Sequence, residues 1–259
     1  MPALTVHSLS YTYPGVSTPV LSDIHFSVDS GEYVAIVGAN GSGKSTLVRC
    51  IDGLLVPPAG SVSVMGYDPN TAEGRAGVRR VMSLVFQSPP DQIVASVVEE
   101  DVAFGLENLA VPVDQMRQRV GSALKATGLY EERLRNPRFL SAGQQQRLAV
   151  AGALAVNAAI VAFDEATSMI DPVGRTGLLD TIDGLVACGV TILHVTHDMD
   201  EVARAGRVLV LSDGRLGFDG TPAAIFAEGR LDCWRAGQPA SWKEALGIGT
   251  EPAVGEETI

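Results

Sequence analysis

Cysteine is scarce in this chain, and the few cysteines are widely separated. Cys50, Cys188 and Cys233 form no C-x-x-C pair and no cysteine–histidine spacing suited to zinc. An odd and dispersed set excludes a disulfide-stapled scaffold of the kind found in small secreted domains. We therefore expect reduced thiols in a cytosolic chain whose 259 residues bury an ordinary hydrophobic core.

Long apolar runs and excess positive charge are also missing. No stretch is long enough to cross a bilayer, and residues 1–10 lack the basic segment and apolar run of a signal peptide. The 30 acidic residues outnumber the 19 basic ones, which gives a formal net charge of −11. This balance argues against a broad surface for anionic lipid or nucleic acid, so we expect no nucleic-acid partner.

Glycine, by contrast, is abundant, and one glycine-rich segment carries a specific pattern. It reads Gly38-Ala39-Asn40-Gly41-Ser42-Gly43-Lys44-Ser45 and fits G-x-x-x-x-G-K-[ST], between a predicted strand at 33–37 and a helix opening at Thr46. In this pattern backbone N–H groups and the helix N-terminus bind phosphate oxygens, Lys44 reaches the β- and γ-phosphates, and Ser45 ligates Mg²⁺. The alternative is a plain Gly-Ser connection, but such loops rarely end in Lys-Ser. The segment predicts a nucleotide site.

A pair of acids follows a second predicted strand. The apolar run 159–163 ends in Asp164 and Glu165, at the carboxyl end of a strand, where open α/β sheets bind ligands. Adjacent side chains diverge, so Asp164 can hold Mg²⁺ while Glu165 polarises the water that attacks the γ-phosphate. An acidic strand end followed by a helix cap is the alternative, and the phosphate-loop pattern makes it the weaker one.

The third informative segment is Leu140-Ser141-Ala142-Gly143-Gln144-Gln145-Gln146-Arg147. It places small residues at the start of a helix predicted over 141–156, whose first N–H groups can bind an anion. Taken alone, it is equally consistent with a helix that Ser141 caps.

The rest of the chain predicts an α/β fold. We expect strands at 4–13, 24–28, 61–65 and 81–86, and then helices at 96–104, with a capping box from Ser96 and Glu99, and from Asp114 to Thr127. Strands at 159–163, 190–195 and 208–211 alternate with helices at 174–185 and 199–205, which favours a parallel sheet. The helical stretch 96–156 is then an insertion between two halves of the sheet. Residues beyond 222 show one short helix and a polar tail.

Together the three segments resemble the ATP-binding cassette (ABC) ATPases, whose signature motif is usually written LSGGQ. The resemblance implies a P-loop ABC ATPase with a mainly parallel sheet core, an N-terminal antiparallel β subdomain and an inserted helical subdomain. We expect the ATPase domain at 1–230, with the helical subdomain at about 96–156, and a C-terminal extension at 231–259.

Further site residues follow from this resemblance. Tyr13 matches the aromatic residue that stacks on adenine, although a core aromatic is a serious alternative. Gln87 matches the glutamine that senses Mg²⁺, and His197, in Thr196-His197-Asp198, matches the histidine that contacts the γ-phosphate. Asp171 ends the segment Ser168-Met169-Ile170-Asp171, which matches a loop that crosses between paired domains. The remaining histidines are expected to be structural: His7, His25 and His194.

In that family two domains enclose two nucleotides, each between the phosphate loop of one and the signature helix of the other. Ser141, Gly143 and Gln144 would therefore contribute to ATP binding across a dimer, and an isolated domain would hydrolyse ATP poorly. The chain departs from the motif at Ala142, which replaces its first glycine. If that backbone is helical alanine fits well, and if φ is positive alanine is strained.

The segment after Gln87 narrows the resemblance to the ATPase subunits of energy-coupling factor (ECF) transporters, which import vitamins and transition-metal ions. The segments that carry this resemblance are Phe86–Val94, Val98–Asn108, Glu165–Pro172 and Met199–Val202. The Ser168-Met169 pair resembles the first of two paralogous ATPases in heterodimeric systems, whereas homodimeric relatives more often have Ala-Gly.

The resemblance implies partners and a location. We expect a second ATPase subunit, in a heterodimer or homodimer, a transmembrane coupling subunit and a separate substrate-capture membrane protein, at the cytoplasmic face of the cell membrane. A groove beside the helix after Gln87 would accept a coupling helix of the membrane subunit, with an acidic surface suited to an Arg-bearing partner. Its residues would be Asp91, Gln92, Glu99, Glu100 and Asp101; a solvated acidic helix face is the alternative.

Two other functions remain open. One is a non-transport ABC ATPase acting on DNA or ribosomes, against which stand the acidic balance and the absence of a basic arm or coiled-coil insertion. The other is a nucleotide-dependent regulatory module with little turnover, against which stand the intact Asp164-Glu165 pair and His197. The transported cargo is not encoded in this chain if a separate protein selects it.

Overall fold

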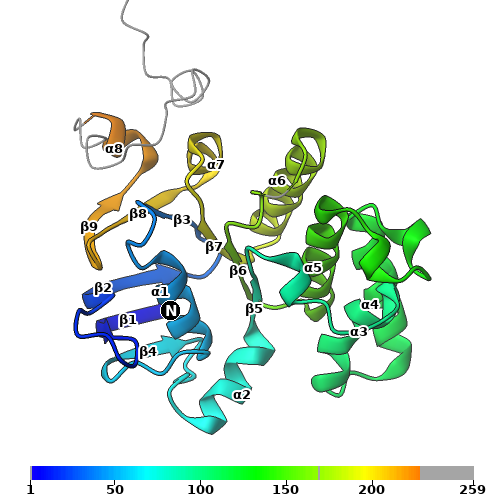
Figure 1. The fold of residues 1–259 in the computed structure, drawn as a ribbon, viewed down its shortest axis with the longest axis horizontal. Coiled ribbons are helices and arrows are strands. Elements are labelled where there is room, and N and C mark those ends of the chain that lie inside the picture. Colours follow the sequence, from blue (N-terminus) through cyan, green and yellow to red (C-terminus); the bar gives the residue numbers. More distant parts are fainter. Residues whose placement is uncertain (1, 169, 228–259) are drawn as a thin grey trace, which may run out of the picture.

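The computed structural model describes residues 2–168 and 170–227. A central sheet divides the molecule, with a small antiparallel sheet on one side and a helical subdomain on the other (Figure 1). Met169, Cys233 and the expected extension at 231–259 lie outside the described residues, so the domain boundary at residue 230 stays a prediction.

The N-terminal strands form the small antiparallel sheet. β1 (Pro2–Tyr11) pairs with both β2 (Leu21–Asp29) and β4 (Ala59–Val64), in the order β2-β1-β4. Burial alternates along β2, as expected for a sheet with one face on the core and the other in solvent. The three strands predicted in this part of the sequence are confirmed with small shifts at their ends.

Within the described residues the central sheet has six strands, in the order β5-β6-β7-β3-β8-β9. Their bounds are β3 Tyr33–Gly38, β5 Met82–Val85, β6 Ile160–Asp164, β7 Thr191–Val195, β8 Arg207–Ser212 and β9 Arg215–Gly220. All neighbouring pairs are parallel except β8 and β9. Because β6, β7 and β3 are neighbours, the loops that follow them meet at one edge of the sheet.

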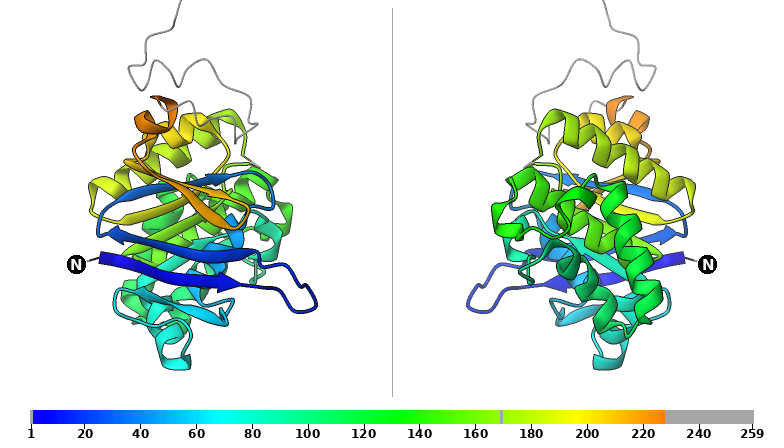
Figure 2. Two further views of the ribbon diagram at one scale, coloured as in Figure 1. Left: turned by 90° about the vertical axis from the view of Figure 1, so that its left-hand side faces the viewer. Right: turned by 90° about the vertical axis from the view of Figure 1, so that its right-hand side faces the viewer.

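Helices cover both faces of this sheet, which is why its inner strands β3, β6 and β7 are buried along their whole length. On β3, Val34 and Ile36 pack towards α1 (Lys44–Asp52) and the small sheet, whereas Ala35 and Val37 pack on the other face. That second face is covered by α6 (Pro172–Ala187) and α7 (Met199–Arg204). Figure 2 shows the two layers from both sides. Each fully buried aliphatic side chain contributes about 1.5–3 kcal/mol to this core.

Between β5 and β6 the chain makes the helical subdomain. It consists of α3 (Val98–Asn108), α4 (Val113–Ala126) and α5 (Ala142–Val156), with short 3₁₀ turns at Pro89–Asp91, Tyr130–Glu132 and Pro137–Phe139. It has its own apolar core, in which α4 buries Val120, Ala123 and Leu124. No helix within residues 2–168 and 170–227 is long and apolar enough to cross a membrane.

The capping box predicted from Ser96 and Glu99 is wrong. The N-cap of α3 is Val97, and the first N–H groups of the helix donate instead to backbone carbonyls: Val98 to Arg135, and Glu99 to Arg133. The donors that a cap would satisfy are therefore already paired within the fold.

Two elements were not predicted, α2 (Ala72–Val81) and β9. In α2 the glycines that argue against a helix are needed for packing, since a Cβ at Gly77 would lie 2.2 Å from the ring of Tyr67. β9 follows an Asp213-Gly214 turn in which both residues have positive φ, the conformation of a tight hairpin. The short helix expected after residue 222 is α8 (Pro222–Ala227).

Candidate active site

The phosphate-loop segment joins β3 to α1, and its glycines are required by geometry. Gly38 has φ of +150°, and a Cβ there would lie 2.2 Å from the carbonyl oxygen of Leu211. Gly43, the N-cap of α1, has φ of +104°, and its Cβ would lie 2.7 Å from Leu21 Cδ2. The loop can approach its neighbours and curl at these positions only because they lack side chains. Ala39, Asn40 and Gly41 are exposed at its tip.

Lys44 lies across the base of this loop. Its Nζ donates to Gly38 O at 2.9 Å and to Ala39 O at 3.1 Å, which uses two of its three N–H donors. Burial lowers the pKa of the ammonium, while the carboxylates of Glu165 and Asp164 act in the opposite direction. The side chain is thus held in the loop with one donor left for an anion.

Ser45 and Asp164 meet below the loop. Ser45 Oγ donates to Asp164 Oδ1 at 2.8 Å, and Asp164 is buried at the end of β6. Burial raises the pKa of this carboxyl, and the hydrogen bond from Ser45 opposes the change. A hydroxyl and a carboxylate oxygen beside a phosphate site are the hard oxygen ligands that Mg²⁺ prefers, so these residues fit the expected metal.

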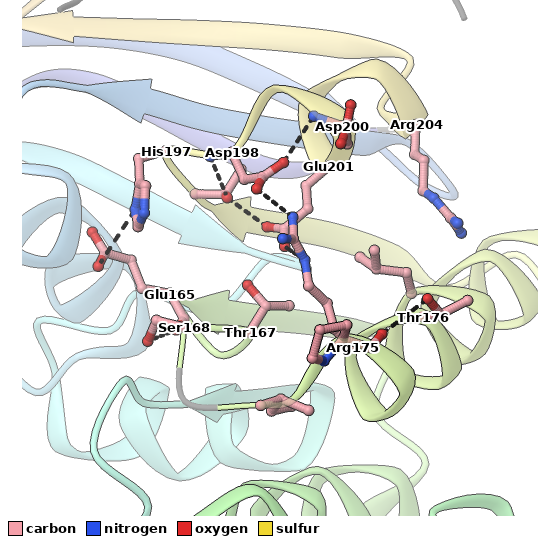
Figure 3. Close-up of a pocket in the computed structure, with 14 residues that line it drawn as sticks. Glu165, Thr167, Ser168, Arg175, Thr176, His197, Asp198, Asp200, Glu201 and Arg204 are labelled. Carbon is pink, nitrogen blue, oxygen red and sulfur yellow. Dashed lines mark hydrogen bonds and ion pairs between the residues drawn. The ribbon is translucent and has the colours of Figure 1, made fainter. Parts of the chain in front are cut away.

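Glu165 stands next to this pair with a distinct set of partners. Its Oε2 accepts from Gln87 Nε2 at 3.0 Å and lies 3.9 Å from His197 Nδ1. Its φ is +51°, uncommon for a residue with a side chain, and its N–H donates to Val195 O at 3.0 Å. The strained backbone turns this carboxylate towards Gln87 and His197, which come from two other loops (Figure 3 shows Glu165 and His197).

A cavity of about 510 Å³ is lined by half of the expected site residues. The lining residues are Tyr13, Val20, Asn40, Gly41, Gly43, Lys44, Ser45, Thr46, Gln87 and Glu165. Tyr13 packs against the core and edge-on to Tyr11, as a core aromatic residue would. Its hydroxyl lies 3.1 Å from Thr46 Oγ1 at the cavity wall. The contact of Tyr13 with adenine stays a prediction.

The signature segment lies elsewhere, at the start of α5 in the helical subdomain. Ser141 Oγ accepts from the N–H of Gln144, and Gln144 Oε1 accepts from the N–H of Ser141, a complete capping box. Asp171 is likewise the N-cap of α6 and accepts from the N–H of Gly174 at 3.0 Å. Within the described part of the chain, Ser141, Gly143, Gln144 and Asp171 are not among the residues that line the phosphate-loop cavity.

Ala142 is the first residue of α5 and has helical backbone. Of the two possibilities for this replacement, the one in which alanine fits is therefore correct. Alanine also has the higher helix propensity, by roughly 1 kcal/mol over glycine.

Two further glutamines, Gln146 and Gln92, hold the loop that carries Gln87, a role that the sequence did not predict. Gln146 is buried in α5 and donates to Phe86 O at 3.2 Å. Gln92, expected on the acidic docking surface, turns inward, accepting from Phe86 N and donating to Phe86 O at 3.1 Å each. Asp101, from the same expected surface, accepts from the N–H groups of Val94 and Ala95. A polar residue amid the apolar positions of α5 was the only signal for Gln146.

Comparisons with known proteins agree with this geometry. Residues 21–168 match the family model described as ABC transporter. The energy-coupling factor transporter ATP-binding protein EcfA1 of Enterococcus faecalis is 45% identical over 88% of this chain and 82% of its own length. Its namesake from Caldanaerobacter subterraneus is 46% identical over 82% of this chain and 77% of its own.

Solved structures give the same result. The cbiO1 structure from Clostridium perfringens, part of the ABC transporter complex cbiONQ, has a TM-score of 0.78 and 32% identity, covering 90% of this chain and 96% of its own. A dimeric post-hydrolysis state of an ATP-binding cassette with ADP and Pi has a TM-score of 0.79 and 28% identity. The match covers 85% of this chain and 98% of that one. The expected resemblance and fold class are confirmed: this chain belongs to the ABC transporter family and, within it, to the energy-coupling factor transporter ATP-binding proteins.

Proposed function

We propose that this chain binds ATP with Mg²⁺ and hydrolyses it to energise an ECF-type importer of vitamins or transition-metal ions. The observation that carries the proposal is that the phosphate loop, Ser45 and Glu165 line one cavity, with Asp164 hydrogen-bonded to Ser45. A nucleotide-binding regulatory module with little turnover would not need a carboxylate oriented by both Gln87 and His197.

The residues divide the chemistry between them. Backbone N–H groups of residues 39–46 and the Lys44 ammonium hold the phosphates, at a helix N-terminus that favours negative charge. Ser45, Asp164 and Gln87 would hold Mg²⁺, and the bound ion would offset the charge that develops on the phosphates. Glu165 polarises the attacking water, and general-base catalysis of this kind contributes about 10²–10⁴-fold. His197, beside Glu165, contacts the γ-phosphate.

A second ATPase domain completes each site. Ser141, Gly143 and Gln144 would contact the nucleotide of a partner copy or paralogue, with Asp171 in the loop between them. Their position away from the cavity of their own chain supports this arrangement. ATP would favour the closed pair and hydrolysis the open pair, a population shift between two packings.

We also propose a location for this chain. An ATP-binding subunit of an ECF transporter is part of a membrane complex, and we place this chain at its cytoplasmic face, docked to a transmembrane coupling subunit that works with a separate substrate-capture protein. The exposed carboxylates of Asp91 and Glu100, with Glu99 beside them, offer an acidic docking surface on the helical subdomain. Residues 1–230 would form the ATPase domain and 231–259 an extension.

Affinity purification from detergent-solubilised membranes of the host tests the proposal. We expect the tagged chain to bring down a second ATPase and a multi-spanning membrane protein, with higher ATPase activity than the isolated chain. The double charge reversal Glu99→Lys/Glu100→Lys should weaken this assembly, whereas Glu73→Lys on exposed α2 should not. Recovery with ribosomes or DNA, at unchanged activity, would support the non-transport ABC ATPase instead.

A further inference from the structure

His197 belongs to a short loop whose two flanking residues are both anchored (Figure 3). On one side, Thr196 Oγ1 donates to Glu201 Oε2 at 2.5 Å. On the other, Asp198 Oδ2 pairs with Arg175 Nη2 at 2.5 Å, and the N–H of Asp198 donates to Thr196 Oγ1 at 3.0 Å. The imidazole itself is 59% exposed, so its position depends on these anchors rather than on packing.

Glu201 is the centre of this arrangement. Its side chain is fully buried in α7, where Oε1 accepts from Arg175 Nε at 2.9 Å and Oε2 lies 3.3 Å from His194 Nε2. His194 is fully buried as well, and its Nδ1 lies 2.8 Å from the hydroxyl of Tyr33 on β3. Burial lowers the pKa of His194, which favours the neutral ring. A buried carboxylate is tolerable only with such partners, and Arg175 supplies the positive charge.

Arg175 itself comes from a different element. It lies in the first turn of α6, the helix that Asp171 caps, and its N–H donates to Asp171 O at 2.8 Å. Its guanidinium reaches two carboxylates at once, with Nε on Glu201 and Nη2 on Asp198. It lines a cavity of about 520 Å³ between α6 and α7, to which Glu165 and His197 also contribute. Arg175 lies outside the lining of the phosphate-loop cavity.

We propose that Arg175 is a positioning residue for ATP hydrolysis: by clamping Asp198 and Glu201 it holds His197 beside Glu165. The same side chain joins that loop to the helix capped by Asp171. This inference rests on the proposed function, because His197 matters only if ATP is hydrolysed here. The planar guanidinium group of arginine is suited to donating to two carboxylates in different directions. The ammonium group of lysine, a single point charge, is not.

Arg204 offers a matched control. It also joins α7 to α6, with Nη1 at 2.6 Å from Asp183 and 3.3 Å from Asp180, but it lies at the end of α7 away from the His197 loop, and although it lines the same cavity its two carboxylate partners are exposed. If Arg175 merely fastens the two helices together, Arg175→Ala and Arg204→Ala should have similar effects. If it positions His197, only Arg175→Ala should affect turnover.

The test uses the purified transporter complex, with each arginine variant in the wild-type and His197→Ala backgrounds. Arg175→Ala should lower kcat at least about tenfold with KM for ATP within about threefold, and Arg175→Lys should restore less than half of the loss. In the His197→Ala background Arg175→Ala should cause little further loss, since residues that act as a unit are not additive. Equal losses in both backgrounds, or a kcat unchanged in Arg175→Ala, would overturn the proposal.

A second readout needs no hydrolysis. In histidine-labelled full-length chain, Arg175→Ala should shift the His197 imidazole NMR signals and leave those of the surface residues His7 and His25 in place, while Arg204→Ala shifts none of them. Unchanged His197 signals in Arg175→Ala would refute the positioning role. A wild-type complex that shows no ATP turnover would instead refute the proposed function, and the NMR comparison would still decide whether Arg175 orders His197.

Discussion

Two helix N-termini in this molecule carry glycine and small polar residues, yet they are built in opposite ways. At α1 the N-cap is Gly43 in a left-handed conformation, with no side chain to accept from the first N–H groups. At α5 the N-cap is Ser141, and with Gln144 it forms a reciprocal capping box. The first terminus leaves its donors to a ligand, whereas the second satisfies two of them internally.

The difference indicates a division of labour. The α1 terminus sits at the edge of the central sheet with Lys44, Asp164 and Glu165 around it, and it needs an anion to complete its hydrogen bonds. The α5 terminus is stable without a ligand and is exposed on the helical subdomain. This difference fits our proposal that the α1 terminus binds the phosphates of this chain's own nucleotide and the α5 terminus contacts the nucleotide of a partner.

Gly43→Ala should break the α1 side of this comparison and have the largest effect of the substitutions at these two termini. The methyl group would meet Leu21 Cδ2 at 2.7 Å and Val20 O at 2.9 Å, at a φ that alanine rarely adopts. Strain of about 1–3 kcal/mol predicts a loss of ATP affinity of about 5- to 150-fold, measured with a fluorescent ATP analogue. Gly152→Ala in α5 is the control, because a Cβ there meets nothing within 4 Å. Equal affinity in Gly43→Ala and wild type would contradict the account of the loop.

Ser141→Ala addresses the other terminus. Loss of the cap should lower the free energy of unfolding by about 1 kcal/mol. ATP affinity of the isolated chain should not change, while turnover of the assembled complex should fall about tenfold. Thr71→Ala, which removes the cap that accepts from Gly74 in α2, should cost similar stability and leave turnover intact. A drop in ATP affinity of the isolated Ser141→Ala chain would show that the two termini are not separate.

Ala142→Gly should have the smallest effect. Because Ala142 is already helical, glycine would reduce helix propensity by about 1 kcal/mol without relieving any strain. Thermal denaturation should report the small loss of stability, and steady-state phosphate release from the complex should stay within about threefold of wild type. A tenfold gain in turnover would mean that the signature segment works in a conformation that alanine resists.

Much of the site could be predicted from local patterns because its parts are contiguous in sequence. The phosphate loop, the Asp164-Glu165 strand end and the Ser141 cap each lie within a few residues, and parallel topology brings the first two together. The predictions that failed depended on packing contacts that the local pattern does not contain. The Ser96 cap was displaced by carbonyls of Arg133 and Arg135. Helix α2 was missed because its glycines, which lower helix propensity, are required by packing, Gly77 against Tyr67 and Gly74 against Asp68.

The long-range side-chain contacts could not be predicted from the sequence. Arg175 and Glu201 are 26 residues apart, and each has an unremarkable place on an expected helix. Gln146 reaches the backbone of Phe86 across 60 residues. Such pairs depend on how helices pack, which neither periodicity nor motif spacing encodes. His194, expected to be structural, lies in the same buried network rather than at the cavity.

The most direct test of the central claim compares Glu165→Gln with wild type in the purified complex, by ATP binding and by phosphate release. The account predicts that ATP still binds while turnover falls at least about 100-fold, because the amide cannot accept a proton from water. Glu73→Gln, on the exposed first turn of α2, should match wild type in both assays. Normal turnover in Glu165→Gln would contradict the assignment of this cavity as the site of hydrolysis.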